Sequence, residues 1–287
     1  MLRTIRALVR LLAIGGVTLA CWIAVLVGVA ATWPWRAARR RVQRAVFRCW
    51  SRTLCRLLGA RVTLRGAAPA PPCLLVTNHL SYIDVLVLAT AVPARFVAKA
   101  EVRRWPLVGL ISRSVDTLYV DRRSRRDALR VAREMAEGLE RGDAIVLFPE
   151  GTSTHGHVVA PFKAPLLAPA AAAELPVHYA AFRYATPAGE LPAHLAVCWW
   201  DDMPFAEHFW RMIQLSGFDA EIAFGAEPVR DADRKALAQR LHRRVTEIFV
   251  PVVDHLPLST DPPPPRSAAV SPGGDRPEVA AEGDSAR

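Results

Sequence analysis

Residues 73–84 read CLLVTNHLSYID, a short apolar run followed at once by a polar turn. The run 73–77 carries no charge and is rich in leucine and valine, which favours a buried β-strand. Asn78 and Ser81 are residue types that commonly begin a helix, so the stretch predicts a strand, a turn and a new helix. In an α/β sheet, a turn of this kind lies at the carboxyl end of a strand, where active sites are usually found.

Further short apolar runs alternate with helical patterns along the chain. The other strand candidates are residues 95–99, 117–120, 144–148, 177–182, 195–199 and 220–224. Between them, Ser124 and Asp127 match a capping box that opens one long helix, and residues 231–249 form a second. The alternation predicts a single α/β domain over residues 59–257, with a mixed sheet flanked by helices.

An uncharged apolar run at residues 11–33 is long enough to cross a hydrocarbon layer of about 30 Å. We interpret residues 1–35 as a single-pass transmembrane anchor. The arginines before it are Arg3, Arg6 and Arg10, and those after it are Arg36, Arg39, Arg40, Arg41, Arg44 and Arg48. The larger cluster normally stays in the cytoplasm, which places the domain on the cytoplasmic side of the inner membrane. The alternative is a cleaved signal peptide ending near residues 29–31, but the length of the run and the arginines after it oppose export.

Residues 36–58 combine many arginines with an apolar stripe. The stripe consists of Val42, Val46, Trp50, Leu54 and Leu57. This spacing predicts an amphipathic helix, which either lies at the bilayer interface or packs on the domain. The pattern alone leaves both interpretations open.

Composition narrows the range of partners. The formal net charge is +10 and 52% of the residues are hydrophobic. Because the basic residues gather beside the apolar run, we expect anionic membrane lipids as the partner and no nucleic acid. The five cysteines lack paired spacing, so neither a disulfide framework nor a zinc site is predicted. Residues 258–287 are rich in Pro, Ser, Gly, Asp and Ala and are predicted to be disordered.

His79 and Asp84 are the first candidates for chemistry. Five positions along a regular helix would turn the two side chains apart, so a contact requires His79 in the turn and Asp84 in the first helical turn. Asp84 would then hold one imidazole nitrogen, and the other would accept a proton from a substrate alcohol. Spacing alone is weak evidence for a catalytic pair, because such residues more often cap helices or pack in cores.

Two further segments place polar residues after predicted strands. Residues 148–153 read FPEGTS, in which Gly151 allows close backbone approach and Glu150 and Thr152 offer polar contacts. Residues 119–122 read YVDR, in which Arg122 is suited to hold a phosphate or a carboxylate. Each segment alone is better explained as a strand-ending turn or a solvated charge, but together they can converge on one crevice.

The order of these segments resembles a known family. NHLSYID, YVDR, FPEGTS and Leu175-Pro176-Val177 are similar to the four motifs of the glycerophospholipid acyltransferases, notably the bacterial 1-acyl-glycerol-3-phosphate type. The resemblance covers roughly residues 60 to 250, and several motifs in order are more specific than any one of them.

The resemblance implies transfer of a fatty acyl group from acyl-coenzyme A or acyl-carrier protein to a lysolipid hydroxyl. The acceptor expected from the resemblance is 1-acyl-sn-glycerol-3-phosphate, and the product is phosphatidic acid. His79 would be the general base and Asp84 would orient it. The residues implied to bind the acceptor are Asn78, Ser81, Arg122, Glu150, Gly151 and Thr152. Leu175, Pro176 and Val177 would shape the acyl-donor side, and no metal or cofactor is expected.

One departure bears on the acceptor. Where many lysophosphatidate enzymes have an arginine in the third motif, this chain has Ser153, which removes a charge suited to a phosphate monoester. The segments EGTSTHG and WWDDMPFAEHFW (199–210) look more like those of the lyso-ornithine lipid acyltransferase branch. Lyso-ornithine lipid is therefore the alternative acceptor. An inactive membrane adaptor that only binds lipid is the alternative of another class.

Overall fold

The computed structural model describes residues 1–105, 108–114, 116–121 and 124–254. The chain divides into two compact units, Met1–His255 and Leu256–Arg287, and the described residues belong to the first. The tail predicted at residues 258–287 lies outside them.

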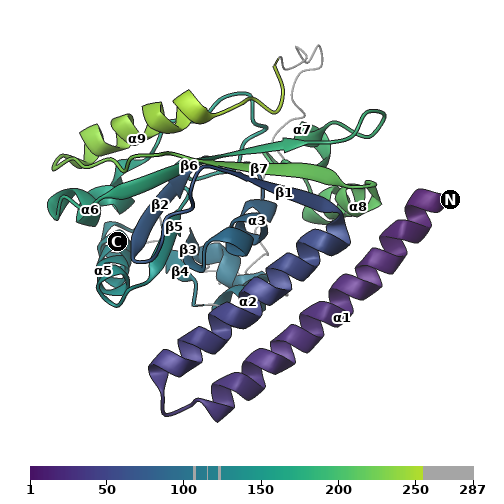
Figure 1. The fold of residues 1–287 in the computed structure, drawn as a ribbon, viewed down its shortest axis with the longest axis horizontal. Helices are drawn as coiled ribbons and strands as arrows, with labels where there is room; N and C mark the ends of the chain where they lie inside the picture. Colours follow the sequence, from purple (N-terminus) through teal and green to yellow (C-terminus); the bar gives the residue numbers. More distant parts are fainter. Residues whose placement is uncertain (106–107, 115, 122–123, 255–287) are drawn as a thin grey trace, which may run out of the picture. The chain divides into compact units, whose positions relative to one another are not determined.

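The described residues form a seven-stranded sheet in the order β1-β7-β6-β2-β5-β3-β4 (Figure 1). Its strands are β1 (Ala60–Arg65), β2 (Cys73–Thr77), β3 (Ala94–Lys99), β4 (Leu118–Val120), β5 (Ala144–Leu147), β6 (Val177–Ala185) and β7 (Phe218–Phe224). β6 and β7 are antiparallel and every other neighbouring pair is parallel. The mixed sheet predicted from sequence is therefore confirmed.

Helices cover both faces of the sheet. They are α1 (Leu2–Ala31), α2 (Arg36–Leu58), α3 (Ile83–Ala91), η1 (Ala100–Arg104), α4 (Val108–Ser114), α5 (Arg125–Glu140), η2 (Ala164–Leu167), α6 (Ala168–Ala172), α7 (Ala193–Ala196), α8 (Phe205–Gln214) and α9 (Arg234–Ile248). Alternate residues of the strands point into two cores. One core packs α2, α3, α7 and α8 against the sheet, and the other packs α5, α6 and α9 against the opposite face.

One strand prediction was wrong, and one strand was missed. Residues 195–199 are no strand: Ala193–Ala196 is a short helix, and Val197 and Cys198 are buried in the core beside it. The run is apolar because it is buried, and its Trp199 N–H donates to the Leu80 carbonyl instead of to a neighbouring strand (2.8 Å). The missed strand is β1, an edge strand whose side chains are mostly exposed and which therefore lacks an apolar pattern.

The two predicted long helices are both present, as α5 and α9, and α9 begins later than predicted. Ser124 caps α5 by accepting from the Asp127 N–H (3.1 Å), as predicted. The Asp127 carboxylate, however, accepts from the Asp121 N–H, so the reciprocal half of the capping box is absent. α9 begins at Arg234, not at residue 231, because Asp233 supplies the N-cap.

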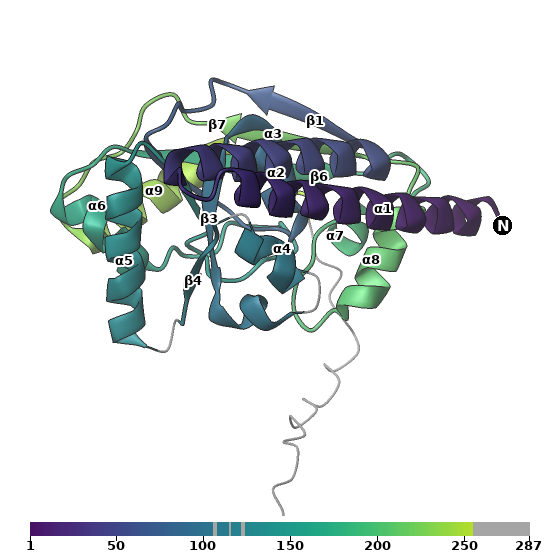
Figure 2. The ribbon, with the colours of Figure 1, turned by 90° about the horizontal axis from the view of Figure 1, so that it is seen from below.

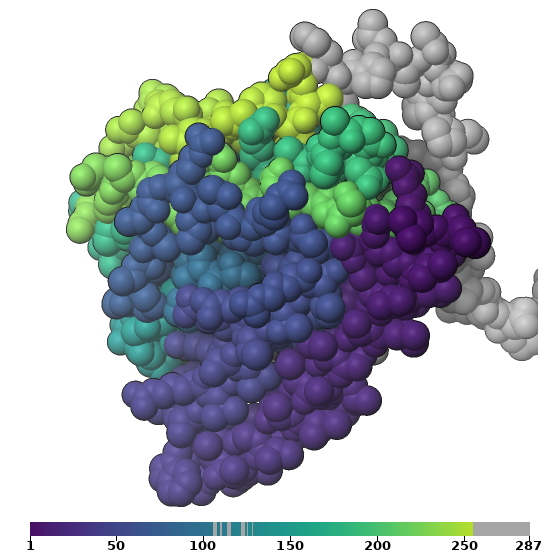
Figure 3. All heavy atoms as spheres, turned by 45° about the vertical axis from the view of Figure 1, so that its right-hand side comes forward, coloured from purple at the N-terminus to yellow at the C-terminus, as the bar shows by residue number. Residues whose placement is uncertain are grey.

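α1 and α2 lie side by side as a helical hairpin whose connecting turn projects beyond the sheet (Figures 1 and 3). Trp50 donates to the Thr18 hydroxyl across the pair (3.0 Å), and Gly28 lies so close to Val42 that a larger residue would overlap it. By length and composition, α1 is able to cross a membrane, and 6% of its most apolar 18-residue window is buried.

α2 packs on the domain through its second half. Its buried residues are Phe47, Ser51, Leu54, Cys55 and Leu58. Arg44 pairs with the buried Asp143, and the Arg48 guanidinium donates to the Thr90 carbonyl at the end of α3 (3.1 Å). Of the two interpretations left open by the sequence, the structure has α2 docked, with α1 as its outer neighbour (Figure 2).

Candidate active site

The turn after β2 holds His79 against Asp84. β2 ends at Thr77 and α3 begins at Ile83, so Asp84 lies in the first turn of α3 and its carboxylate points back over the turn. His79 Nδ1 is 2.8 Å from Asp84 Oδ2, with His79 in the turn and Asp84 in the first helical turn, the placement that such a contact needs. The same oxygen accepts from the N–H groups of Leu80 (2.7 Å) and Ser81 (3.0 Å). The carboxylate thus fixes the turn and the imidazole together.

The sheet supplies the second oxygen of Asp84 with a partner. β6 runs parallel to β2 and extends past its end, so Tyr184 reaches the turn. The Tyr184 hydroxyl donates to Asp84 Oδ1 (2.6 Å), and both side chains are buried. Burial raises the pKa of the Tyr184 phenol well above its usual range, and the Asp84 charge adds to the shift.

The imidazole of His79 is partly exposed at the surface. Its side chain is 22% exposed, whereas that of Asp84 is fully buried. The imidazole stacks on Phe148, which follows β5, at 4.2 Å between ring centroids. Because Nδ1 donates to Asp84, the unprotonated Nε2 is left to accept a proton.

Glu150 connects the turn to the neighbouring loop. Its two carboxylate oxygens accept from the backbone N–H groups of His79 (2.8 Å) and Ala160 (3.1 Å). Thr154 in turn donates its N–H to the His79 carbonyl (2.9 Å). Burial raises the pKa of Glu150 to about 8, against the opposing effect of the two N–H donors. Glu150 therefore holds the backbone of the site.

Asn78 and Ser81, expected to contact the acceptor, are turned inward. The Asn78 amide binds both backbone groups of Phe182 on β6, accepting from N–H (2.7 Å) and donating to C=O (3.2 Å). Ser81 is fully buried and its hydroxyl has no hydrogen-bond partner. Both residues shape the turn from within, so the structure gives neither side chain access to a ligand.

The third-motif residues flank the histidine. Gly151 is buried with φ +83°, a conformation that favours glycine, and Thr152 is exposed beside it. Arg122, assigned to the polar end of the acceptor, lies outside the described residues. β4, which precedes it, ends at the same edge of the parallel strands as β2 and β5.

Leu175, Pro176 and Val177 are not near the histidine. They precede or begin β6, and Val177 is paired with Leu74, near the start of β2. His79 lies beyond the other end of β2, about 15 Å away at roughly 3.3 Å per residue. Val177 is fully buried in the core beneath α9, so the expected role on the acyl-donor side has no geometric support.

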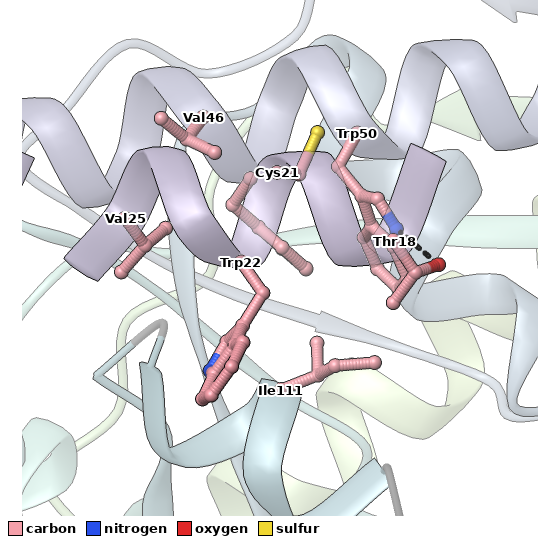
Figure 4. Close-up of a pocket in the computed structure, with 8 residues that line it drawn as sticks. Thr18, Cys21, Trp22, Val25, Val46, Trp50 and Ile111 are labelled. Carbon is pink, nitrogen blue, oxygen red and sulfur yellow. Dashed lines mark hydrogen bonds between the residues drawn. The ribbon is translucent and has the colours of Figure 1, made fainter. Parts of the chain in front are cut away.

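An apolar pocket lies between α1, α2 and α4 (Figure 4). It is lined by Thr18, Cys21, Trp22, Val25, Val46, Phe47, Trp50 and Ile111. A series of aromatic contacts leads from it to the site: Phe47 to Phe96 (6.3 Å), Phe96 to Phe148 (6.4 Å) and Phe148 to His79. Sequence reasoning missed this pocket because its walls come from three separate helices.

A basic pocket opens beside η1, which follows β3. It is lined by Ala100 and the exposed Arg103, Arg104 and Arg113. The Arg103 guanidinium lies over the Tyr119 ring at 5.9 Å. In the described part of the chain, no group of three or more His, Cys, Asp or Glu side chains is arranged to hold a metal ion.

His208 is a further residue that sequence reasoning missed. It lies on α8, is 1% exposed, and its Nδ1 is 3.0 Å from the hydroxyl of Tyr82 in the catalytic turn. Burial lowers the pKa of His208 to about 4, so it is neutral at physiological pH. The sequence signal that could have pointed to His208 was its place in the segment WWDDMPFAEHFW.

A histidine held by a buried carboxylate, at the carboxyl edge of a mixed sheet, is typical of enzymes that activate an alcohol or a water. Residues 60–182 match the family model described as Acyltransferase. The chain is 36% identical to lyso-ornithine lipid O-acyltransferase of Brucella abortus over 212 residues, covering 69% of this chain and 79% of the relative. This chain therefore belongs to the acyltransferase family.

Other relatives fit the same assignment. A 1-acyl-sn-glycerol-3-phosphate acyltransferase of Neisseria gonorrhoeae is 28% identical over 199 residues, covering 67% of this chain and 77% of the relative. The crystal structure of the 1-acyl-sn-glycerophosphate acyltransferase from Thermotoga maritima aligns with a TM-score of 0.59 at 21% identity, over 85% of this chain and 97% of that one. The family and fold predicted from the sequence are confirmed.

Proposed function

We propose that this enzyme transfers a fatty acyl group from a thioester donor to the free hydroxyl of a lysolipid, with His79 as the general base. The observation that carries the proposal is the 2.8 Å contact between His79 Nδ1 and Asp84 Oδ2, which leaves Nε2 as the nitrogen that can accept a proton. The family membership supports the reaction class, and the geometry supports His79 as the base.

The chemistry follows from that arrangement. His79 Nε2 removes the proton from the lysolipid hydroxyl as its oxygen attacks the thioester carbonyl. The tetrahedral intermediate collapses to an ester and expels the thiolate, which takes the proton back from the imidazolium. The Asp84 carboxylate stabilises the imidazolium, as the buried aspartate of a serine-protease triad does. The nucleophile belongs to the acceptor, so no acyl-enzyme is formed.

We propose lyso-ornithine lipid as the acceptor. Ser153 in place of arginine weakens the case for a phosphate monoester, and the Brucella abortus relative carries that activity in its name. Lysophosphatidate, the acceptor expected from sequence, is the second candidate, because the pocket lined by Arg103, Arg104 and Arg113 suits a phosphate.

The donor is acyl-coenzyme A or acyl-carrier protein, and its acyl chain needs an apolar site. α1 attaches the enzyme to the inner membrane with the site facing the cytoplasm. Lysolipid then reaches the site from the membrane to which α1 is attached.

The test presents the purified enzyme with both labelled donors and a panel containing lyso-ornithine lipid and lysophosphatidate. We expect His79→Ala to lower kcat/KM by about a thousandfold or more, as loss of a catalytic base does. His242→Ala is the matched control, because this histidine lies on α9 across the sheet and bonds the Val159 carbonyl. Wild-type activity in a folded His79→Ala variant would refute the mechanism. No turnover with any donor would instead support the lipid-binding adaptor.

A further inference from the structure

The two oxygens of the Asp84 carboxylate have different partners. Oδ2 accepts three hydrogen bonds, from His79 Nδ1 and from the N–H groups of Leu80 and Ser81. Oδ1 accepts one from the Tyr184 hydroxyl at 2.6 Å. Because Asp84 is fully buried, the phenol occupies the position that solvent would otherwise fill. Four donors therefore fix this carboxylate, and one of them comes from a strand 100 residues away.

Tyr184 is itself held rigidly. Its ring stacks on Phe182 (6.3 Å between centroids, 20° between planes) and meets Phe218 edge-on (6.0 Å, 75°). The ring is 1% exposed, so its hydroxyl has little freedom to move. The raised pKa of the phenol keeps it protonated, and it remains a donor throughout the pH range in which a histidine base works.

We propose that Tyr184 is a positioning residue for the His79–Asp84 pair, acting through Asp84 on both its orientation and its charge. The bond to Oδ1 stops the carboxylate from rotating, so Oδ2 stays aimed at His79 Nδ1. It also draws negative charge away from Oδ2, which moderates the attraction of Asp84 for the protonated imidazole. The proposal rests on the proposed function, in which His79 is the base.

The test compares Tyr184→Phe with the wild type and with Tyr179→Phe. Tyr179 is a matched control because it lies on the same strand, is 7% exposed, and faces the core on the other side of the sheet. We expect Tyr184→Phe to lower kcat about tenfold, in keeping with the loss of one hydrogen bond to a charged group, while the KM values for both substrates change little. The acidic limb of the kcat/KM profile should shift to higher pH, because Asp84 then holds the imidazolium more strongly.

A second variant keeps the ring and changes only the donor. Replacing Tyr184 by 3-fluorotyrosine makes the phenol a stronger donor to Asp84, so the acidic limb should shift in the opposite direction, to lower pH. This variant decides the question if Tyr184→Phe fails to fold. An acidic limb that stays at the wild-type pH in the folded variants overturns the proposal, even where kcat falls, because a purely structural role would lower activity without moving the limb.

The outcomes separate this inference from the proposed function. If the wild type transfers no acyl group, or His79→Ala retains activity, the proposed function fails. If the wild type is active, His79→Ala is inactive, and the Tyr184 variants leave the limb unmoved, only the role of Tyr184 fails.

Discussion

The Glu150 carboxyl lies between two backbone N–H groups and is 2% exposed. Its pKa is raised from 4.5 to about 8, mainly by burial, so the folded chain keeps a proton that the unfolded chain releases. The stability linked to Glu150 is therefore complete below about pH 4.5, declines above it, and is lost as the pH rises through about 8. We expect the thermal midpoint of the wild type to fall between pH 5 and pH 9 more than that of Glu150→Gln.

The control for that comparison is Glu247→Gln, because Glu247 is exposed on α9 and pairs only with a neighbouring arginine. Its midpoint should follow the wild type across the pH range. Equal pH dependence in Glu150→Gln and the wild type would show that Glu150 is not the group responsible.

Distance along the chain limits what sequence predicts about single residues. The His79–Asp84 contact was predictable because it spans five residues and one turn, so local geometry decides it. Tyr184 contributes to the same carboxylate from β6, and its position depends on strand pairing. The resemblance implied that Asn78 binds the acceptor, yet its amide is bonded to the backbone of Phe182 on the neighbouring strand.

At the scale of elements, α2 is joined to the sheet by a buried charge. Asp143 lies at the start of β5, is 2% exposed, and pairs with Arg44 of α2 and with the buried Arg95 of β3. Asp143→Ala leaves Arg95 buried with one fewer counter-charge. We expect the free energy of unfolding to fall by about 3 kcal/mol, the usual cost of breaking a buried pair.

Chemical denaturation in detergent measures this loss, and Asp219→Ala is the control. Asp219 pairs with Arg61 across β7 and β1, but both side chains are more than half exposed. Removing an exposed pair should cost less than about 1 kcal/mol. Equal losses in the two variants would mean that Asp143 does not dock α2.

Element boundaries follow from burial more than from hydrophobicity alone. The apolar run at 195–199 is hydrophobic enough for a strand, but it packs over the catalytic turn and bonds Leu80. β1 is a strand, but too few of its side chains are buried to give the apolar pattern that predicts one. The sequence predicted that the arginines of α2 face anionic lipid. In the structure, Arg44 pairs with Asp143, and Arg48 donates to the Thr90 carbonyl at the end of α3.

At the scale of the whole molecule, the start of α1 is attached to the catalytic domain. Arg6 donates to the Gln214 carbonyl (3.0 Å), and Arg10 donates to those of Ile213 (3.1 Å) and Leu215 (2.6 Å), at the end of α8. These bonds satisfy carbonyls that a helix end leaves free. α8 also carries His208, which bonds Tyr82 in the catalytic turn. α1 and the site thus share one connecting helix.

This attachment bears on membrane topology. The arginine count predicts a single crossing, with the start of α1 across the membrane from the domain. The bonds from Arg6 and Arg10 instead place that start beside α8, with the α1–α2 turn farthest away. We therefore expect the first turn of α1 and the catalytic domain to lie on the same side of the membrane.

Single cysteines at Leu2, Trp35 and Glu247, introduced one at a time into a chain without its native cysteines, measure this directly. All three positions are exposed in the structure. A membrane-impermeant thiol reagent added to inverted vesicles should label Leu2→Cys and Glu247→Cys alike, because both positions would then lie on the cytoplasmic side. Trp35→Cys, in the projecting turn, should be shielded by lipid. Labelling of Leu2→Cys only from the periplasmic side would support the single crossing. The bonds from α1 to α8 would then have to be broken in the membrane.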